Sequence, residues 1–224
     1  MRKLITTITT IGVCVLTAAC GGDKGTDTVT PAPSTEISPV AEDALDGLLL
    51  SPAEIGATVG ATRMIVISTS TSLAEDIKAP PDAPKEKVAC IGIAGTAEAQ
   101  AYEGSGSTAV RDQLLQTADG SGPKLTAGQS LVLFASAAQA ADFLSASAER
   151  WSACREFTLG EQVSKVGPVS NNNGMLSTSF PSGDLVCQRA LTATNNVAVE
   201  AASCGAGPES AVKIASQLVA KIAE

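Results

Sequence analysis

Runs of β-prone residues mark the segment from Asp184 to Gly205 as the clearest structural feature of the chain. Two such runs, Leu185–Thr194 and Val197–Ser203, flank the dipeptide Asn195-Asn196. Asparagine tolerates a positive φ, which both central residues of a two-residue type I′ turn require. The pattern therefore predicts a β-hairpin in which Thr194 faces Val197.

The register of this hairpin places Cys187 directly opposite Cys204. Counted from the turn, the two residues form a non-hydrogen-bonded pair, whose Cα atoms approach to about 4.5 Å. That separation lies at the near edge of disulfide geometry, roughly 4.4–6.8 Å. The hairpin thus predicts a disulfide, and a disulfide indicates an oxidising compartment.

Three segments have the hydrophobic periodicity of helices. Residues 41–59 contain an apolar face and then the capping box Ser51-Pro52-Ala53-Glu54, and Gly60 ends this region. Apolar residues recur at helical spacing along Ser136–Trp151, and again after Pro208-Glu209 to the C-terminus, with Pro208 expected at the first helical position.

Strands are predicted between these helices. Thr108–Thr117 fits a strand or a helix, and we interpret it as a strand after the turn Gly104–Gly106. A surface loop is expected at residues 73–87, which contain three prolines, and a hairpin turn at residues 171–174. The remaining expected strands or extended segments are 63–70, 129–134, 157–169 and 175–180. This order predicts a single α+β domain.

The N-terminus has the features of an export signal. Arg2-Lys3 precede a short apolar stretch, and small residues precede Cys20, as in a bacterial lipobox. The alternative is an ordinary cleaved signal peptide in which Cys20 has no special role. We therefore expect a lipoprotein signal peptide at 1–19, a disordered tether at 20–40 that holds the protein on the extracytoplasmic face of the membrane, and a folded domain at 41–224.

The composition of the chain argues against several classes of function. The formal net charge is −8 without any cluster of lysine and arginine, so nucleic acid is not an expected partner. The chain contains no histidine, which excludes Ser-His-Asp and Cys-His catalysis and a histidine-bearing zinc site. No diagnostic catalytic spacing is present, so we expect neither an enzyme nor a cofactor.

Four cysteines remain when Cys20 and Cys14 of the signal peptide are set aside. Since the hairpin pairs Cys187 with Cys204, Cys90 and Cys154 are left to form a second disulfide. A zinc site is the competing interpretation, which the lack of histidine and of a C-x-x-C motif disfavours.

Five residues are candidates for ligand contact. Arg189 and Glu200 form a diagonal pair beside the hairpin disulfide, and this pair is either an ordinary surface ion pair or the lining of a cleft. Trp151, the only tryptophan, fits packing against Cys154 better than ligand stacking, whereas Tyr102 fits either role. Arg111 is either a solvated charge or an anion contact.

The sequence also resembles a known family, the extracellular sensor domains of PknH-type mycobacterial receptor kinases and of stand-alone lipoproteins. The resemblance is carried by the four cysteines and by segments such as PPDAPKEKVAC, AYEGSGSTAVRDQLL, LVLFASAAQAADFLSASAERWSAC and CQRALTATNNVAVEAASCG, which occur in the family's order. It implies a twisted antiparallel sheet with packed helices, a V-shaped cleft, and the disulfides Cys90–Cys154 and Cys187–Cys204.

The resemblance implies that the domain senses or binds an unidentified extracellular ligand. No kinase domain or membrane-spanning segment is recognised in this sequence, so we expect recognition outside the membrane. The first hypothesis is a lipid-anchored module that binds a small or amphiphilic envelope molecule in a cleft. The second is a module that docks on an envelope protein, such as a receptor kinase, and the third is a hydrolase of unrecognised type.

Overall fold

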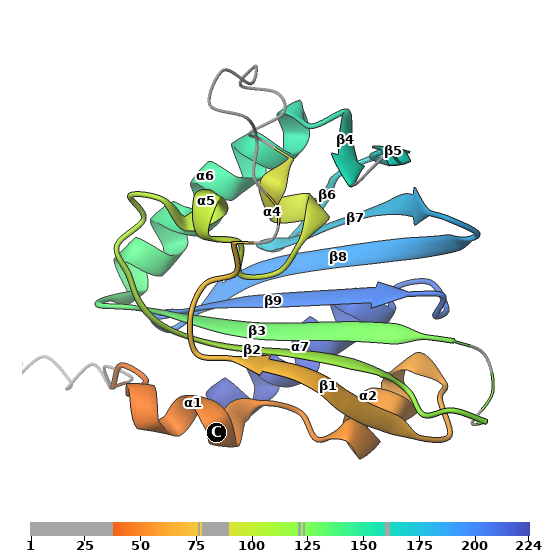
Figure 1. Ribbon diagram of the computed structural model, residues 1–224. Helices are drawn as coiled ribbons and strands as arrows, with labels where there is room; N and C mark the ends of the chain where they lie inside the picture. The colour runs from red at the N-terminus through yellow and green to blue at the C-terminus, as the bar shows by residue number, and fades with distance from the viewer. Residues whose placement is uncertain (1–37, 76, 78–89, 121, 123, 160–161) are drawn as a thin grey trace, which may run out of the picture. The chain divides into compact units, whose positions relative to one another are not determined.

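The structure, a computed structural model, describes residues 38–75, 77, 90–120, 122, 124–159 and 162–224. These residues form a seven-stranded antiparallel sheet in the order β1-β2-β3-β9-β8-β7-β6 (Figure 1). The strands are β1 (Met64–Ser70), β2 (Ser107–Thr117), β3 (Thr126–Phe134), β6 (Ser170–Asn172), β7 (Met175–Ser182), β8 (Leu185–Thr194) and β9 (Val197–Cys204). A separate hairpin consists of β4 (Glu156–Leu159) and β5 (Gln162–Lys165).

Helices cover both faces of the sheet (Figure 1). One face, here called the α6 face, carries α4 (Ile91–Ala94), α5 (Ala99–Tyr102) and α6 (Ala137–Ala153). The other, the α7 face, carries the 3₁₀ turn η1 (Glu42–Ala44), α1 (Leu45–Leu48), α2 (Pro52–Val59) and α7 (Ser210–Ile222). Each face has its own hydrophobic core, which is the arrangement expected of an α+β domain.

The predicted hairpin is present with the predicted register. Thr194 faces Val197, and Cys187 faces Cys204 with Cα atoms 4.0 Å apart in a disulfide. The type I′ turn was wrong, because Asn195 has a φ of 50° whereas Asn196 is not in the positive-φ region. A positive φ at the first central residue alone is the sign pattern of a type II′ turn.

Asn196 of this turn has a buried side chain that is bonded to residues outside the hairpin. Its amide donates to the carbonyl oxygens of Phe134 and Val40, and its oxygen accepts from the Val40 amide at 2.7 Å. Asn195 likewise donates to the Ser38 carbonyl. Residues 38–40, which we placed in the tether, are therefore attached to the domain, and the rest of the signal peptide and tether lie outside the described residues.

Local sequence signals account for both ends of α2 and for the start of α6. Ser51 and Glu54 form the predicted capping box of α2, and Gly60 ends that helix with a φ of 77°. Ser136 caps α6 by accepting from the Gln139 amide. The apolar stripes of α6 and α7 are mainly buried, as their 3.6-residue period predicts.

The starts of one helix and one strand differ from the predictions. Pro208 is not the first residue of α7, which begins at Ser210 because Glu209 has a left-handed φ of 65°. Strand β3 starts at Thr126, three residues before the predicted Gln129. Residues 157–169, predicted as extended, contain the β4–β5 hairpin, and most of the predicted loop 73–87 lies outside the described residues.

Candidate functional site

A groove lies on the α7 face, beside the first turn of α7 and over strands β6, β7 and β8. Its cavity volume is about 440 Å³. The residues that line it are Pro168, Ser170, Ser177, Thr178, Ser179, Val186, Gln188, Arg189, Ala206, Pro208, Glu209, Ala211 and Val212. Ligand sites are typically concave and combine apolar walls with a few polar groups, and this groove has that composition.

The register of the strands shows which side chains form the floor of the groove. Ser170 faces Ser177, and Ser179 faces Gln188. Ser177 also faces Ala190, which belongs to the hydrophobic core of the α7 face. Because neighbouring residues of a strand alternate between faces, the side chains of Ser170, Ser177, Ser179 and Gln188 all project into the groove.

The same alternation places Thr178 and Arg189 with their side chains on the α6 face, so they border the groove with main-chain atoms. Among the described lining residues, Glu209 is then the one ionisable side chain on the α7 face. The walls are apolar, and Val186 remains 57% exposed at the edge, beside Leu185 at 39%. The groove therefore combines a hydroxyl-lined floor, apolar walls and one carboxylate.

The Arg189 side chain lies in a buried polar cluster under α4 and α5. Arg189 and Glu200 form an ion pair although only 1% and 4% of their side chains are exposed. The guanidinium also donates to the carbonyl oxygens of Ala201, Gly92 and Gly95 at 2.8–3.0 Å. Of the two alternatives for this pair, the ordinary surface ion pair was wrong, because the segment Ile91–Tyr102 covers this face of the hairpin.

Tyr102 completes the cluster by donating its hydroxyl to Glu200. Its ring is buried and stacks on Phe143 at a centroid distance of 4.2 Å. Burial, with the Glu200 charge as the next cause, raises the pKa of the Tyr102 hydroxyl well above its usual value. The hydroxyl is therefore a hydrogen-bond donor to the carboxylate across the ordinary pH range.

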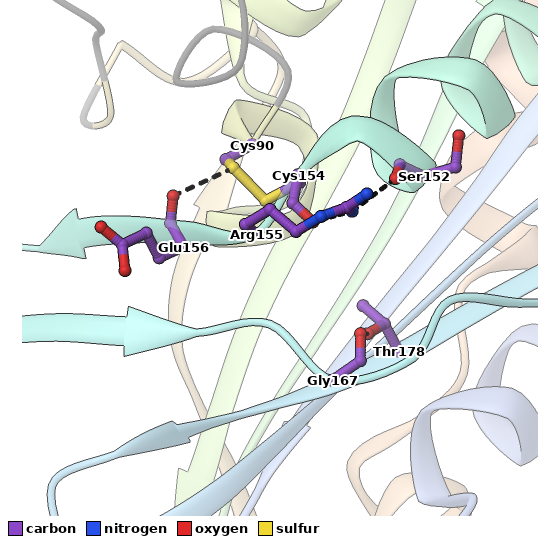
Figure 2. The surroundings of a disulfide bond; sticks show 7 residues. All are labelled: Cys90, Ser152, Cys154, Arg155, Glu156, Gly167 and Thr178. Carbon is purple, nitrogen blue, oxygen red and sulfur yellow. Dashed lines mark hydrogen bonds between the residues drawn. A yellow bond between two sulfur atoms is a disulfide. The ribbon is translucent and has the colours of Figure 1, made fainter.

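Trp151 and the second disulfide lie at the edge of this cluster. Trp151 is 1% exposed, and the Arg189 guanidinium carbon lies 5.9 Å from its ring centroid. Cys90 and Cys154 form the disulfide that joins the α4 segment to the end of α6, with Cα atoms 5.1 Å apart. Figure 2 shows this bond, with Arg155 donating to the Ser152 carbonyl beside it. The predicted packing of Trp151 beside Cys154 matches its burial.

Arg111 is separate from the other four candidates. It is bonded to Asp46 through Nε at 3.0 Å and lies 3.6 Å from Glu42. It borders a polar cleft of about 410 Å³ between the α1–α2 connection and strands β1 and β2, with Lys221 and Glu54 as a further ion pair. Hydrogen bonding to Asp46 raises the pKa of Arg111, so its charge is held by carboxylates of the domain itself.

The structure thus unites four of the five predicted ligand residues, Tyr102, Trp151, Arg189 and Glu200, in one buried cluster. The cavity that adjoins this cluster has a volume of only about 30 Å³, which is far smaller than the groove on the α7 face. Direct ligand contact by these residues stays a prediction. Sequence reasoning missed the serine row of the groove floor, whose signal was the alternation of Ser177 and Ser179 along a predicted strand.

Fold and cysteine chemistry together define a class of protein, a disulfide-bonded α+β domain that suits an oxidising compartment. No helix among the described residues is both long enough and apolar enough to cross a membrane.

The chain belongs to the PknH-like extracellular domain family, whose model matches residues 40–221. It is similar to the serine/threonine-protein kinase PknH of Mycobacterium tuberculosis strain H37Rv, at 27% identity over 87% of this chain and 32% of the kinase. The kinase of Mycobacterium bovis is 28% identical over 86% of this chain and 33% of the kinase. The chain therefore spans about a third of the length of these relatives.

A solved structure also matches, the crystal structure of the extracellular domain of PknH from Mycobacterium tuberculosis. The TM-score is 0.72 at 25% identity, and the match covers 83% of this chain and 98% of that one. The family assignment, the α+β fold and the two disulfides are confirmed. Membership of an extracellular domain family also places the domain outside the cytoplasm.

Proposed function

We propose that this domain is a binding module, anchored to the membrane by lipid on Cys20, whose groove on the α7 face takes a small or amphiphilic molecule of the cell envelope. The observation that carries the proposal is the groove itself. A cavity of about 440 Å³ is large enough for a small molecule, and its floor offers hydrogen bonds while its walls offer apolar contact.

Recognition is favoured over catalysis by the groups that line this groove. Acid–base hydrolysis needs two carboxylates, and a Ser-Lys dyad needs a lysine beside a serine. Among the described lining residues there is one carboxylate, Glu209, and no lysine. We therefore propose a binding function without a chemical step.

The experiment is native mass spectrometry of the lipid-anchored protein released from its own membrane. We expect a retained ligand as a mass in excess of the acylated chain, and its loss in Ser177→Phe, which fills the groove floor. Ser68→Phe, the same change on the exposed strand β1, is the matched control and should retain the ligand. Equal retention by both variants would place the ligand elsewhere and contradict the proposal.

A second candidate function is docking on a membrane protein, because exposed apolar residues gather at a sheet edge. Strand β1 is the outer strand of the sheet, and Val66, Ile67 and the neighbouring Leu114 are 38%, 46% and 39% exposed. Edge strands offer unpaired main-chain groups for pairing with another chain. In this case Ile67→Lys should abolish co-purification of a membrane partner after cross-linking in cells, whereas Ser177→Phe should not.

A further inference from the structure

We propose that the groove selects an uncharged amphiphile, with a hydroxyl-bearing head group on the serine row and an alkyl chain along the apolar wall. This inference rests on the proposed function, since it assigns a ligand class to the same groove.

The charged side chains around the groove disfavour an anionic head group. Among the described residues that line the groove, Glu209 is the one whose ionisable side chain lies on the α7 face. The whole protein carries a formal charge of −8. The guanidinium of Arg189 points to the other face, where it is bonded to Glu200 and to three carbonyl oxygens. An anion in the groove would lose its hydration without gaining a counter-charge, and it would be repelled by Glu209.

The floor fits a ligand that carries hydroxyl groups. Ser170, Ser177 and Ser179 form no side-chain hydrogen bond to another described residue, so their hydroxyls are open to a ligand. Each hydroxyl both donates and accepts, which matches the same ability in the hydroxyls of a polyol or sugar. Gln188 donates to the Gly207 carbonyl and keeps its amide oxygen as a further acceptor.

The wall fits an alkyl chain better than a ring system. Pro168, Ala206, Pro208 and Val212 line it together with the exposed Val186, and no aromatic residue is among the described lining residues. Flat rings, including the apolar faces of sugars, are normally held by aromatic stacking. Without such a platform, a sugar alone would gain little apolar contact in the groove. The alkyl chain of the ligand must therefore provide the apolar contact.

The test compares three probes that separate head group, chain and charge. Octyl glucoside, below its micellar concentration, has both parts; methyl glucoside has the head alone; octanoate has an alkyl chain of nearly the same length with a negative head. Titration calorimetry on the full chain should show octyl glucoside binding, with the other two at least about tenfold weaker, a difference of one decade in Kd.

Substitutions in the groove test whether the probes bind there. Ser177→Phe should abolish octyl glucoside binding, and the milder double change Ser177→Ala with Ser179→Ala should weaken it, while Ser68→Phe should leave it unchanged. Glu209→Lys should raise octanoate affinity, because it replaces the repelling carboxylate with a cation. Melting curves establish that each variant is folded, and the alanine pair keeps the test decisive if the phenylalanine variant unfolds.

The possible outcomes distinguish an error in the proposed ligand class from an error in the proposed binding site. If octanoate binds the unaltered domain as tightly as octyl glucoside, and Ser177→Phe abolishes both, the ligand class is wrong while the groove stands as the site. If methyl glucoside binds as tightly as octyl glucoside, the alkyl chain is not recognised and the class is again wrong. If neither Ser177→Phe nor the alanine pair changes binding of any probe, the groove is not the site and the proposed function fails.

Discussion

At the scale of single residues, burial decides what the ionic groups do. Arg189 and Glu200 form an ion pair across the neighbouring strands β8 and β9, whereas Arg111 of β2 pairs with Asp46 of helix α1. The first is enclosed by the Ile91–Tyr102 segment, whereas 69% of the Asp46 side chain is exposed. Exposed pairs contribute little because water competes with them, whereas a buried charge without its partner is strongly unfavourable.

Removing one partner of the buried pair should therefore be costly. Glu200→Gln leaves the Arg189 charge buried and unpaired, and we expect a loss of about 3–5 kcal/mol in the free energy of unfolding. Urea denaturation followed by circular dichroism measures this loss. Arg111→Met is the matched control and should cost about 0–1 kcal/mol, since the carboxylates that it leaves unpaired, Asp46 and Glu42, are exposed to water.

The double replacement Arg189→Met with Glu200→Leu removes both charges at once. It should cost clearly less than Glu200→Gln, because no buried charge is left without a partner. A double replacement that is as destabilising as the single one would show that the carbonyl contacts of the guanidinium, and not the charge pair, hold the cluster together.

Tyr102 should give the domain a specific weakness at high pH. Its pKa is raised by burial and by Glu200, so the folded state keeps the proton that the unfolded chain releases near its ordinary pKa of about 10. Above that pH the unfolded state binds fewer protons, and the free energy of unfolding falls as the pH rises, whereas below it the contribution is complete.

The chain has one tyrosine, so phenolate absorbance reports this group alone. In a pH titration, absorbance should stay flat past pH 10 and rise only together with unfolding seen by circular dichroism. In urea the same titration should show ordinary tyrosine ionisation. A phenolate signal near pH 10 in the folded protein would mean that the hydroxyl is not enclosed.

At the scale of elements, the segment Ile91–Tyr102 depends on its tertiary contacts. Helices α4 and α5 have four residues each, too few for stability on their own. The segment is held by the disulfide at Cys90, by Arg189 bonds to the Gly92 and Gly95 carbonyls, and by main-chain bonds between Ala74 and residues 97 and 99. The hairpin β8–β9, by contrast, has a complete ladder in addition to its disulfide.

The two disulfides should therefore contribute differently. On a chain-entropy model, Cys90–Cys154, which links residues 64 apart, contributes about 4 kcal/mol, and Cys187–Cys204, which links residues 17 apart, about 3 kcal/mol. Replacing Cys90 and Cys154 by serine should lower the melting temperature more, and should speed amide hydrogen exchange at residues 90–102. Replacing Cys187 and Cys204 should leave exchange in that segment nearly unchanged; faster exchange there in both variants would contradict the assignment of separate roles.

At the scale of the whole molecule, the groove depends on how α7 meets the sheet. The left-handed Glu209 delays the start of α7 until Ser210, which leaves Pro208 and Glu209 at the groove wall instead of in the helix. In our proposal, attachment to the membrane depends on Cys20, which lies outside the described residues. Attachment and binding are thus assigned to separate parts of the chain.

This separation predicts that anchoring can be removed without loss of binding. Cys20→Ala should release the protein from membranes into the soluble fraction, because in our proposal acyl chains on this residue provide the attachment. The released protein should bind octyl glucoside with unchanged affinity. Fractionation and immunoblotting measure the first result, and retention of Cys20→Ala in the membrane would contradict a lipid anchor at this residue.

The sequence alone determined the features that depend on neighbours along the chain. The capping box at Ser51, the buried stripes of α6 and α7 and the pairing of Cys187 with Cys204 follow from local periodicity and register, and the second disulfide followed by elimination. These signals act within a few residues or across one tight turn, so they can be read without knowing the rest of the fold.

Tertiary structure decided which of the predicted surfaces are covered. Register showed that Arg189 and Glu200 share a face, but their burial depends on a segment about a hundred residues earlier in the chain. The groove arises in the same way, because the serine row belongs to strands β6 and β7 whereas Glu209 precedes α7, and the two meet only when α7 packs on the sheet. Burial and concavity are properties of such long-range packing, which local sequence patterns do not encode.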